Sequence, residues 1–352
     1  MSKSPFVWDK YSDQPSVIKD KSYKKKMRKR YIFDYVIMLF SSIIVLPISI
    51  ILMKFFKGNQ NITNKDFIGI GVNLDKGNMQ QKLVDELNVQ NLIIRLPLSD
   101  IENIDLYVEF AKSFNKTSNK NILLNILQDR EHIENKELLK KDLDLIFSKF
   151  SSFVFEYQIA TTINRAKWGF FAVQEYLGFY KVAQDLRDKK YKDLKLLGPS
   201  VIDFEYYYNV RAMFNFYNIK YDKLSALLYV DRRGKPTNTQ YGFFDTKNKI
   251  DLLYSLCKLS SKVNDEIYIT EVNWPILNTA PYAPTSEKEC VSNELYTKYM
   301  NEYINIAKNS RKIKRVYWHQ LIAPGYGLVD NRDGKIVKLP QFYKFKEMLN
   351  EN

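Results

Sequence analysis

The sequence contains little of what metal-binding, redox and nucleotide-binding proteins are built from. It has only two cysteines in 352 residues, Cys257 and Cys290, and they form neither a CxxC pair nor part of a metal-ligand cluster. Whether they form a disulfide stays open. No GxGxxG or other phosphate-binding loop follows the first predicted strand. We therefore expect neither a metal ion nor a cofactor.

Acidic residues are too few to balance the basic ones, and the imbalance is uneven along the chain. The net charge is +14, from 54 Lys and Arg against 40 Asp and Glu. Residues 1–30 hold ten Lys or Arg against three Asp, so this short segment carries half of the excess. The rest of the chain has no Arg-rich helix and no zinc-finger spacing, so we expect no nucleic-acid partner.

Charged residues are absent from one long stretch near the N-terminus. Nineteen uncharged residues run from Tyr35 to Met53, which is enough for a helix to span the hydrocarbon core of a bilayer. Pro47 lies inside this stretch, and a membrane helix tolerates proline. A secretory signal peptide is the alternative. The long charged segment before it, and the lack of a small-x-small cleavage site before Asn61, favour an uncleaved anchor.

These features predict a membrane protein with four parts. Residues 1–30 form a basic cytoplasmic segment, 31–56 a transmembrane helix, 57–65 a polar linker and 66–352 the folded domain. The Lys and Arg excess keeps the N-terminal flank in the cytoplasm. The Lys-, Asn- and Ile-rich composition is typical of some bacteria. We therefore predict a single-pass inner-membrane protein whose folded domain lies in the periplasm.

After the linker, apolar runs typical of buried strands alternate with segments of helical spacing. The predicted strands lie at 67–74, 91–98, 121–127, 153–161, 194–202, 223–230, 266–274 and 314–322, and each is followed by a predicted helix. Eight such units predict an α/β fold of the (β/α)8 TIM-barrel class. Nearly continuous apolar strands also suit a parallel sheet that is covered on both faces. A doubly wound open sheet is the alternative.

Polar side chains gather where the predicted strands end. In TIM barrels the functional groups lie at the C-terminal ends of strands and in the loops that follow. Glu271, in the run EIYITEVNWP, is the candidate catalytic carboxylate, because burying a carboxylate without partners is costly. Tryptophans beside amides and arginines suit a sugar ligand. The candidate substrate-binding residues are Arg95, Gln158, Asn164, Arg165, Trp168, Arg232, Arg233, Asn273, Trp274, Trp318 and Gln320.

The loop YVDRRGKPTNTQYGFFD, residues 229–245, is unusually long for a compact domain. It brings Arg232, Arg233 and Lys235 together among aromatic residues. Arginine binds a carboxylate or phosphate group through two parallel hydrogen bonds, so this loop would suit an anionic ligand. A solvated loop whose charges face water is the alternative.

Several of these stretches together resemble the glycoside hydrolases with (α/β)8 barrels that use two glutamates. The resemblance rests on ITEVNWP, on a tryptophan in the last strand and on the tail GLVDNRDGKIVKLPQFYKFKEML, and it covers roughly residues 65–350. In that superfamily the seventh strand supplies the nucleophile. The resemblance therefore implies that Glu271 is the nucleophile.

The fourth predicted strand departs from that pattern. The family ends this strand in an Asn-Glu pair whose glutamate is the general acid/base, whereas here FEYQIATTINRAKWG places Thr161 and Thr162 there. Glu156 is the nearest carboxylate and is the predicted second catalytic residue, provided that it reaches the bond; paired carboxyls stand ~5–5.5 Å or ~6.5–9.5 Å apart. The acid could also come from Glu205, Asp231, Asp100, the substrate or a partner subunit. A catalytically inactive barrel, which binds carbohydrate or scaffolds a partner hydrolase, is the other interpretation.

The predicted anchor, the INRAKWG and YVDRRG stretches and the missing acid/base together resemble the membrane-bound two-protein hydrolases that remove 3-deoxy-manno-octulosonic acid (Kdo). This resemblance implies lipopolysaccharide, or another envelope glycan, as substrate and a second hydrolase subunit as partner. The ketosidic bond of such a sugar is labile, so its cleavage needs less protonation. Its carboxylate would suit the arginines.

Overall fold

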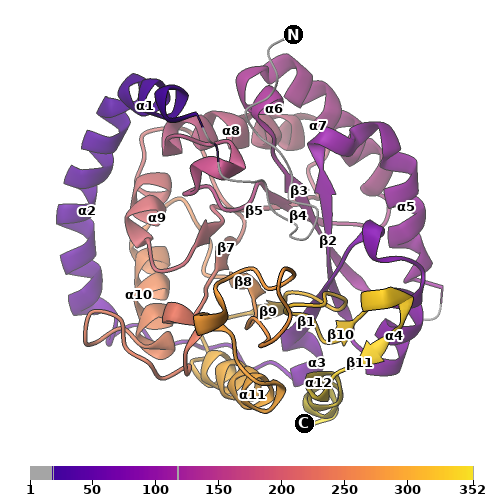
Figure 1. Ribbon diagram of the computed structural model, residues 1–352. Helices are drawn as coiled ribbons and strands as arrows, with labels where there is room; N and C mark the ends of the chain where they lie inside the picture. The colour runs from indigo at the N-terminus through magenta and orange to yellow at the C-terminus, as the bar shows by residue number, and fades with distance from the viewer. Residues whose placement is uncertain (1–17, 19, 117–118, 352) are drawn as a thin grey trace.

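A curled parallel sheet wrapped by helices makes up most of the protein. The computed structural model describes residues 18, 20–116 and 119–351. Residues 1–17 and 19 of the predicted basic segment, and residue 352, lie outside the described residues. Seen along the axis of the sheet, the strands form the centre and the helices form a ring around them (Figure 1).

Within the described residues, nine parallel strands form one sheet in the order β5-β4-β3-β2-β1-β9-β8-β7-β6. They are β1 (Ile68–Val72), β2 (Asn91–Pro97), β3 (Asn121–Leu127), β4 (Glu156–Ile159), β5 (Lys195–Leu197), β6 (Val201–Ile202), β7 (Leu224–Leu227), β8 (Ile267–Val272) and β9 (Arg315–Trp318). Each lies inside a predicted strand, and β5 and β6 divide the fifth one. The sequence prediction of a TIM-barrel-like α/β fold is confirmed at this level.

The two edges of the curled sheet, β5 and β6, are neighbours in the chain. Only residues 198–200 separate them. A parallel bridge between Leu197 and Lys223 links the end of β5 to the start of β7. The sheet therefore curls until its edges approach each other, which brings the C-terminal ends of the strands to one rim.

The surrounding helices follow the strands in the expected alternation. They are α3 (Asn64–Phe67), α4 (Met79–Leu87), α5 (Ile104–Ser113), α6 (Arg130–Glu134), α7 (Lys136–Phe150), α8 (Val173–Lys190), α9 (Tyr206–Met213), α10 (Thr246–Leu259), α11 (Asn293–Asn309) and α12 (Pro340–Asn350). A short antiparallel hairpin, β10 (Val329–Asp330) and β11 (Val337–Lys338), precedes α12.

Strand side chains alternate between two cores because successive residues point to opposite faces of a sheet. Ile93, Leu123, Leu197, Tyr268 and Tyr317 form a separate buried cluster inside the curled sheet. The neighbouring residues of the same strands belong to a much larger cluster that packs against the helices. Both faces are therefore apolar and covered, as parallel sheets require.

Two helices lie outside this arrangement. Helix α1 (Lys21–Arg30) carries the basic cluster, and α2 (Ile32–Leu52) runs across the outside of α9 and α10 (Figure 1). By length and composition α2 is a candidate membrane span, and it lies near the N-terminus, where a signal sequence would have the same properties. The predicted anchor is thus a continuous apolar helix.

A buried histidine joins α6 to α7. The His132 ring lies 2.8 Å from Asp129 through Nδ1 and 2.9 Å from Asp142 through Nε2. Burial acts to lower the pKa of His132, but the hydrogen bonds and charges of Asp129 and Asp142 outweigh it and raise the pKa above the ordinary 6.5. The charged imidazolium is therefore favoured by folding.

The interaction of His132 with Asp129 and Asp142 predicts that the stability of the folded protein depends on pH. Because the folded pKa of His132 is raised, its contribution to the free energy of unfolding is fully present below about pH 6.5 and declines as pH rises through the folded value. We expect His132→Gln to lower stability at pH 6 more than at pH 9. Urea unfolding at several pH values measures this. An equal loss of stability at both pH values would contradict it.

Candidate functional site

Glu271 reaches the rim of the sheet through an irregularity in β8. Strict alternation would place Ile269 and Glu271 on the same face, and Ile269 packs in the outer core. The pairing of β8 with β9 shifts register between Ile269 and Val272, however, and Val272 also packs in the outer core. Such a shift re-aims side chains. Glu271 consequently lines a cavity at the mouth of the sheet.

The Glu271 carboxylate has a close partner in Tyr229. The hydroxyl of Tyr229 donates a hydrogen bond to Oε1 at 2.5 Å, and Nδ1 of His319 lies 4.0 Å from Oε2. Burial, followed by the charge of Glu271, raises the pKa of Tyr229 well above its usual value, so the phenol stays protonated and donates. Tyr229 therefore orients Glu271, whose side chain lines the cavity.

The cavity lies where strands β2, β4, β6, β7, β8 and β9 end, and its volume is about 200 Å³. Its lining combines cations, carboxylates and aromatic rings: Arg95, Thr162, Arg165, Lys167, Trp168, Ile202, Asp203, Tyr229, Arg233, Glu271, Asn273, Pro284, Thr285, His319 and Tyr326. A second hollow of about 430 Å³ shares Arg165, Asp203, Tyr229, Arg233 and Thr285 with it. The two hollows are therefore adjacent.

Two buried atoms in this lining have hydrogen-bonding capacity to spare. Nη1 of Arg233 and Oδ1 of Asn273 form no hydrogen bond within the described part of the chain. The guanidinium of Arg233 stacks on the ring of Tyr229, with its central carbon 3.2 Å from the ring centre. Buried polar groups are normally paired, so the unpaired N–H of Arg233 beside the cavity favours a ligand that accepts a hydrogen bond, such as an anion.

Cations outnumber carboxylates around the cavity. Arg95, Arg165, Lys167 and Arg233 line it together with Glu271 and Asp203. One carboxylate is already engaged, because Arg165 forms ion pairs with Asp203 at 2.8 Å and with Glu205 at 2.6 Å. The imbalance favours a ligand that carries negative charge.

Lys167 combines burial with a cationic neighbour. Burial lowers its pKa most, and the charge of Arg165 lowers it further, while Glu271 and Asp203 act in the opposite direction. The net effect is a pKa below the ordinary 10.5. An amine of lowered pKa is a better proton donor than an ordinary lysine.

Around the mouth of the cavity, several residues adopt a left-handed backbone conformation that residues other than glycine seldom adopt. Thr162, Asp203, Arg232 and Arg233 all have positive φ, between 48° and 62°. Such strain persists only where surrounding structure over-determines it, and it gathers at functional sites. Its presence in three different loops at one rim supports a ligand-binding role for that rim.

Six of the predicted site residues meet at this cavity: Arg95, Arg165, Trp168, Arg233, Glu271 and Asn273. The guanidinium of Arg95 lies over the ring of Trp168, 5.7 Å from the ring centre. Arg232 is exposed and lines only the neighbouring hollow. The six residues come from strands β2 and β8 and from the loops after β4, β7 and β8.

The structure does not bring Glu156 to Glu271. Glu156 is the first residue of β4, and therefore lies at the opposite end of the sheet. There it bonds Lys223 at 2.7 Å and the hydroxyl of Tyr268 at 3.0 Å, with Arg315 3.5 Å away. This corrects the interpretation of Glu156 as a catalytic partner, since the N-terminal end of such a sheet contributes to stability.

The two tryptophans expected to stack on a sugar are buried in the core. Trp274 and Trp318 have no exposed surface and stack on each other with ring centres 5.8 Å apart. The indole nitrogen of Trp274 donates to the carbonyl of Gly234 at 3.0 Å, and that of Trp318 to the hydroxyl of Tyr296 at 2.6 Å. These residues pack in the outer core against tyrosines of α11 and do not line the cavity.

Three predicted polar residues also have structural partners. Asn164 donates to Glu205 at 2.7 Å and accepts from the backbone of Ile202 at 3.0 Å, so it ties the loop after β4 to β6. Gln158 donates to Asn125 at 3.1 Å. Gln320 is buried and donates to the hydroxyl of Tyr326 at 3.1 Å. The cavity lining includes none of the three.

Sequence reasoning missed several lining residues. Asp203 directly follows a predicted strand, so its position was a usable signal. Tyr229 begins the long predicted loop 229–245, but it was not among the candidate site residues. Lys167 and His319 lie at or just after the ends of predicted strands and share the rim position, although they were not among the candidate site residues. Tyr326 carries no local pattern that marks it, and the folded chain brings all three to one cavity. Within the described residues, no group of three His, Cys, Asp or Glu side chains could hold a metal ion.

Comparisons with known proteins identify the fold. No protein-family model and no curated protein matches the chain. Among solved structures, it is similar to a β-glucosidase from Thermotoga maritima (TM-score 0.59, 10% identity, 81% of this chain and 98% of the other). It is also similar to a GH39 enzyme from Xanthomonas axonopodis pv. citri, with a TM-score of 0.57 and 11% identity over 82% of this chain and 67% of the other. A third similar structure is a GH2 β-galacturonidase from Eisenbergiella tayi bound to galacturonate, with a TM-score of 0.53 and 10% identity over 80% of this chain and 50% of the other. These structural neighbours are glycoside hydrolases, and at such identities the likeness shows the fold alone.

The unpaired nitrogen of Arg233 predicts a preference for carboxylated sugars. We expect the protein to bind glucuronate more tightly than glucose, and Arg233→Met to reduce that preference by about tenfold, because a charge-assisted hydrogen bond contributes about 1.5–3 kcal/mol. NMR titration of both sugars measures it. Arg232→Met is the matched control, since that neighbouring side chain is exposed and should change binding less. Equal loss in both variants would contradict the assignment.

Proposed function

We propose that this protein is a glycosidase-like hydrolase that acts on an acidic sugar held in the cavity of Glu271. The observation that carries the proposal is the hydrogen-bonded Glu271 carboxylate in a cavity lined by four cations and a tryptophan. The fold shared with glycoside hydrolases supports this reaction class. The β-galacturonidase among the structural neighbours, which binds galacturonate, supports an acidic substrate.

The proposed mechanism assigns a separate task to each side of the cavity. Glu271 attacks the anomeric carbon or stabilises the positive charge that develops there, as carboxylates do in glycoside hydrolysis. Tyr229 holds Glu271 in place. Arg233 and Arg95 bind the carboxylate of the sugar, and Trp168 offers an aromatic edge to the ring. Water then completes the hydrolysis of the C–O bond.

Lys167 is the proposed proton donor to the leaving oxygen. Thr162 occupies the place expected for the acid, and a threonine cannot supply a proton at neutral pH. Asp203 lines the cavity but is paired with Arg165 at 2.8 Å. Lys167 lies five residues after Thr162, lines the same cavity and carries a proton whose release burial favours. It replaces Glu156 in the proposed mechanism.

The substrate that fits these features best is a ketosidically linked 3-deoxy-2-ulosonic acid, with Kdo of lipopolysaccharide as the specific candidate. Its carboxylate matches the arginines, and its labile bond matches a site without a carboxylic acid opposite Glu271. Attachment to a membrane through α2 would keep the protein near such a lipid-linked substrate. Periplasmic placement at the inner membrane and a second hydrolase subunit stay predictions from the sequence.

Replacing the candidate nucleophile tests the reaction. We expect Glu271→Gln to lower the release of Kdo from lipopolysaccharide by at least about two orders of magnitude, because an amide neither attacks nor carries the stabilising charge. The assay uses membranes that contain the full-length protein together with its native partners. Glu266→Gln, at the other end of the same strand, is the control and should retain activity. Equal release by both variants would exclude catalysis by Glu271.

The proton donor can be tested through the pH profile. Protonated Lys167 is the active form, so kcat should fall as pH rises through its pKa, which lies below the ordinary 10.5. We expect Lys167→Arg to lower kcat with little change in KM, since arginine keeps the charge but does not release its proton. The alkaline decline should disappear in that variant. An unchanged alkaline decline would assign it to another group.

A carbohydrate-binding barrel without catalysis is the second candidate function. Thr162 in the acid position is the observation that favours it. In that case Glu271→Gln would leave the function intact, whereas Trp168→Ala would weaken sugar binding. Glu271→Gln therefore separates the two functions, and Trp168→Ala confirms that the cavity binds sugar.

A further inference from the structure

Helix α2 turns polar side chains toward the protein and apolar side chains outward, the reverse of a surface helix on a soluble protein. Its buried residues are Asp34, Met38, Ser42 and Ser49, which fall on one face at helical spacing. The opposite side is apolar and exposed, with Phe33 80% and Ile51 68% accessible. A surface helix of a soluble protein turns its apolar stripe to the core and its polar face to water. Helix α2 does the opposite.

The polar face of α2 is bonded to the barrel near its beginning. The carboxylate of Asp34 forms an ion pair with Arg211 of α9 at 2.7 Å, and both side chains are at most 5% exposed. The backbone N–H of Gln174, at the start of α8, donates to the same carboxylate at 3.0 Å. A buried charge is tolerated only with such partners, so Asp34 fixes this end of α2 to the barrel.

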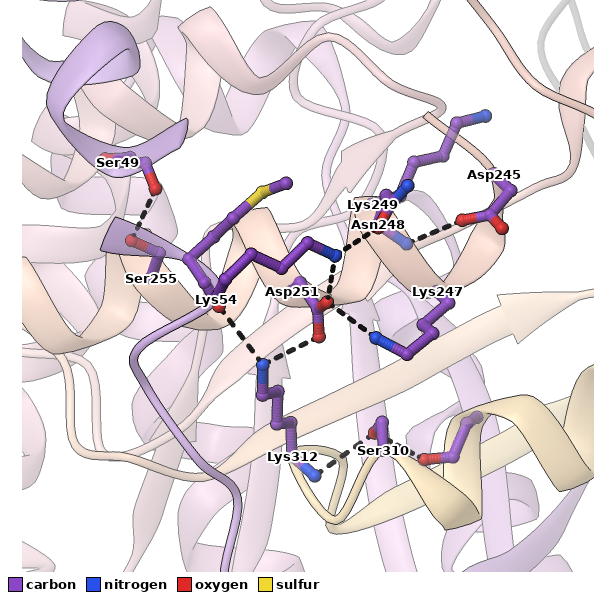
Figure 2. A network of polar contacts seen from close by, with 12 residues as sticks. Ser49, Lys54, Asp245, Lys247, Asn248, Lys249, Asp251, Ser255, Ser310 and Lys312 are labelled. Carbon is purple, nitrogen blue, oxygen red and sulfur yellow. Dashed lines mark hydrogen bonds and ion pairs between the residues drawn. The ribbon is translucent and has the colours of Figure 1, made fainter. Parts of the chain in front are cut away.

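The other end of α2 is bonded to the barrel as well (Figure 2). Ser255 of α10 donates to the carbonyl of Ser49 at 2.9 Å. Just beyond the helix, Lys54 pairs with Asp251 at 2.9 Å, and Lys312 pairs with the same carboxylate at 2.6 Å. Burial acts to raise the pKa of Asp251, but the surrounding lysines hold it below its usual value. Asp251 therefore stays charged and keeps the cluster together.

These contacts conflict with a helix that crosses a bilayer. A helix of 21 residues is ~30 Å long, about the thickness of the hydrocarbon core. If α2 crossed the membrane with both ends still bonded to the barrel, α9 and α10 would enter the hydrocarbon with it. If it crossed without them, Arg211 would lose its buried partner and Asp34 would face lipid. Both arrangements expose charged groups to an apolar medium.

Cations flank the exposed apolar face at both ends. Helix α1 precedes it with the sequence KSYKKKMRKR, and most of these basic side chains are exposed. Lys54 and Lys57 follow it and are also exposed. An apolar face with basic flanks is the pattern of a helix that lies in the membrane interface and attracts anionic headgroups.

We propose that α2 attaches the protein to an anionic lipid bilayer by lying in the membrane plane, with its outward apolar face in the lipid and both of its ends on the barrel side. This arrangement differs from the spanning helix that the sequence predicts, and it does not depend on what the cavity cleaves. An exposed apolar patch of this extent is otherwise rare on a soluble protein.

The sidedness of the two ends tests the proposal. In the full-length protein with Cys290→Ser, single cysteines are introduced by Ser22→Cys before α2 and by Asn61→Cys after it; both positions are exposed, and Cys257 is buried. A membrane-impermeant maleimide is then applied to sphaeroplasts before and after lysis. We expect both cysteines to label under the same condition. Labelling of one before lysis and the other only after it would overturn the proposal.

Two further variants separate docking from insertion. Asp34→Leu should lower the melting temperature of the folded domain because Arg211 loses its partner, and Asp34→Leu with Arg211→Leu should recover part of the loss. An unchanged melting temperature in Asp34→Leu would show that the helix is not docked. Ile43→Lys with Ile44→Lys should reduce flotation with phosphatidylglycerol-containing liposomes, while Phe216→Lys, at another fully exposed apolar residue, should not. Equal flotation of all three proteins would exclude the apolar face as the lipid contact.

Discussion

The common direction of the strands is the constraint on which the candidate site depends. Because all nine strands run parallel, their C-terminal ends meet at one rim and their N-terminal ends at the other. Ionisable side chains are sorted accordingly. Glu271 and the arginines gather at the first rim, whereas Glu156, Lys223 and Arg315 neutralise one another at the second. At the N-terminal rim the charged groups pair with one another. At the C-terminal rim, charged groups and hydrogen-bonding capacity remain for a ligand.

The chemistry of the mouth follows from partial desolvation. Burial makes the ammonium of Lys167 easier to deprotonate and the phenol of Tyr229 harder to deprotonate. The same low-polarity surroundings strengthen the hydrogen bond from Tyr229 to Glu271 and increase the cost of leaving Arg233 unpaired. A cavity arranged in this way would favour an anionic ligand over water, and it holds a donor, an acceptor and an oriented carboxylate in one place.

The order of strands and helices could be predicted from the sequence because apolar periodicity is local. Residues at strand ends, such as Glu271 and Arg95, could be placed at the rim for the same reason. The direction of each side chain could not, because the register shift in β8 changes which residues point inward. Trp274 and Trp318 were expected in the cavity and are buried in the outer core against α11. Hydropathy sums over the whole circumference of a helix, so it marked α2 as apolar without revealing its polar face.

The segment after β4 contacts both the cavity and helix α1. Its residues Lys167 and Trp168 line the cavity, while Ala166 and Phe171 pack against Met27 of α1, and Glu175 accepts a hydrogen bond from Tyr31 at 2.8 Å. The segment therefore connects the cavity to the helices α1 and α2 through direct contacts. Binding at the two places would be coupled reciprocally. If binding to a lipid surface raised the affinity for the ligand by some factor, ligand binding would raise the affinity for the lipid surface by the same factor.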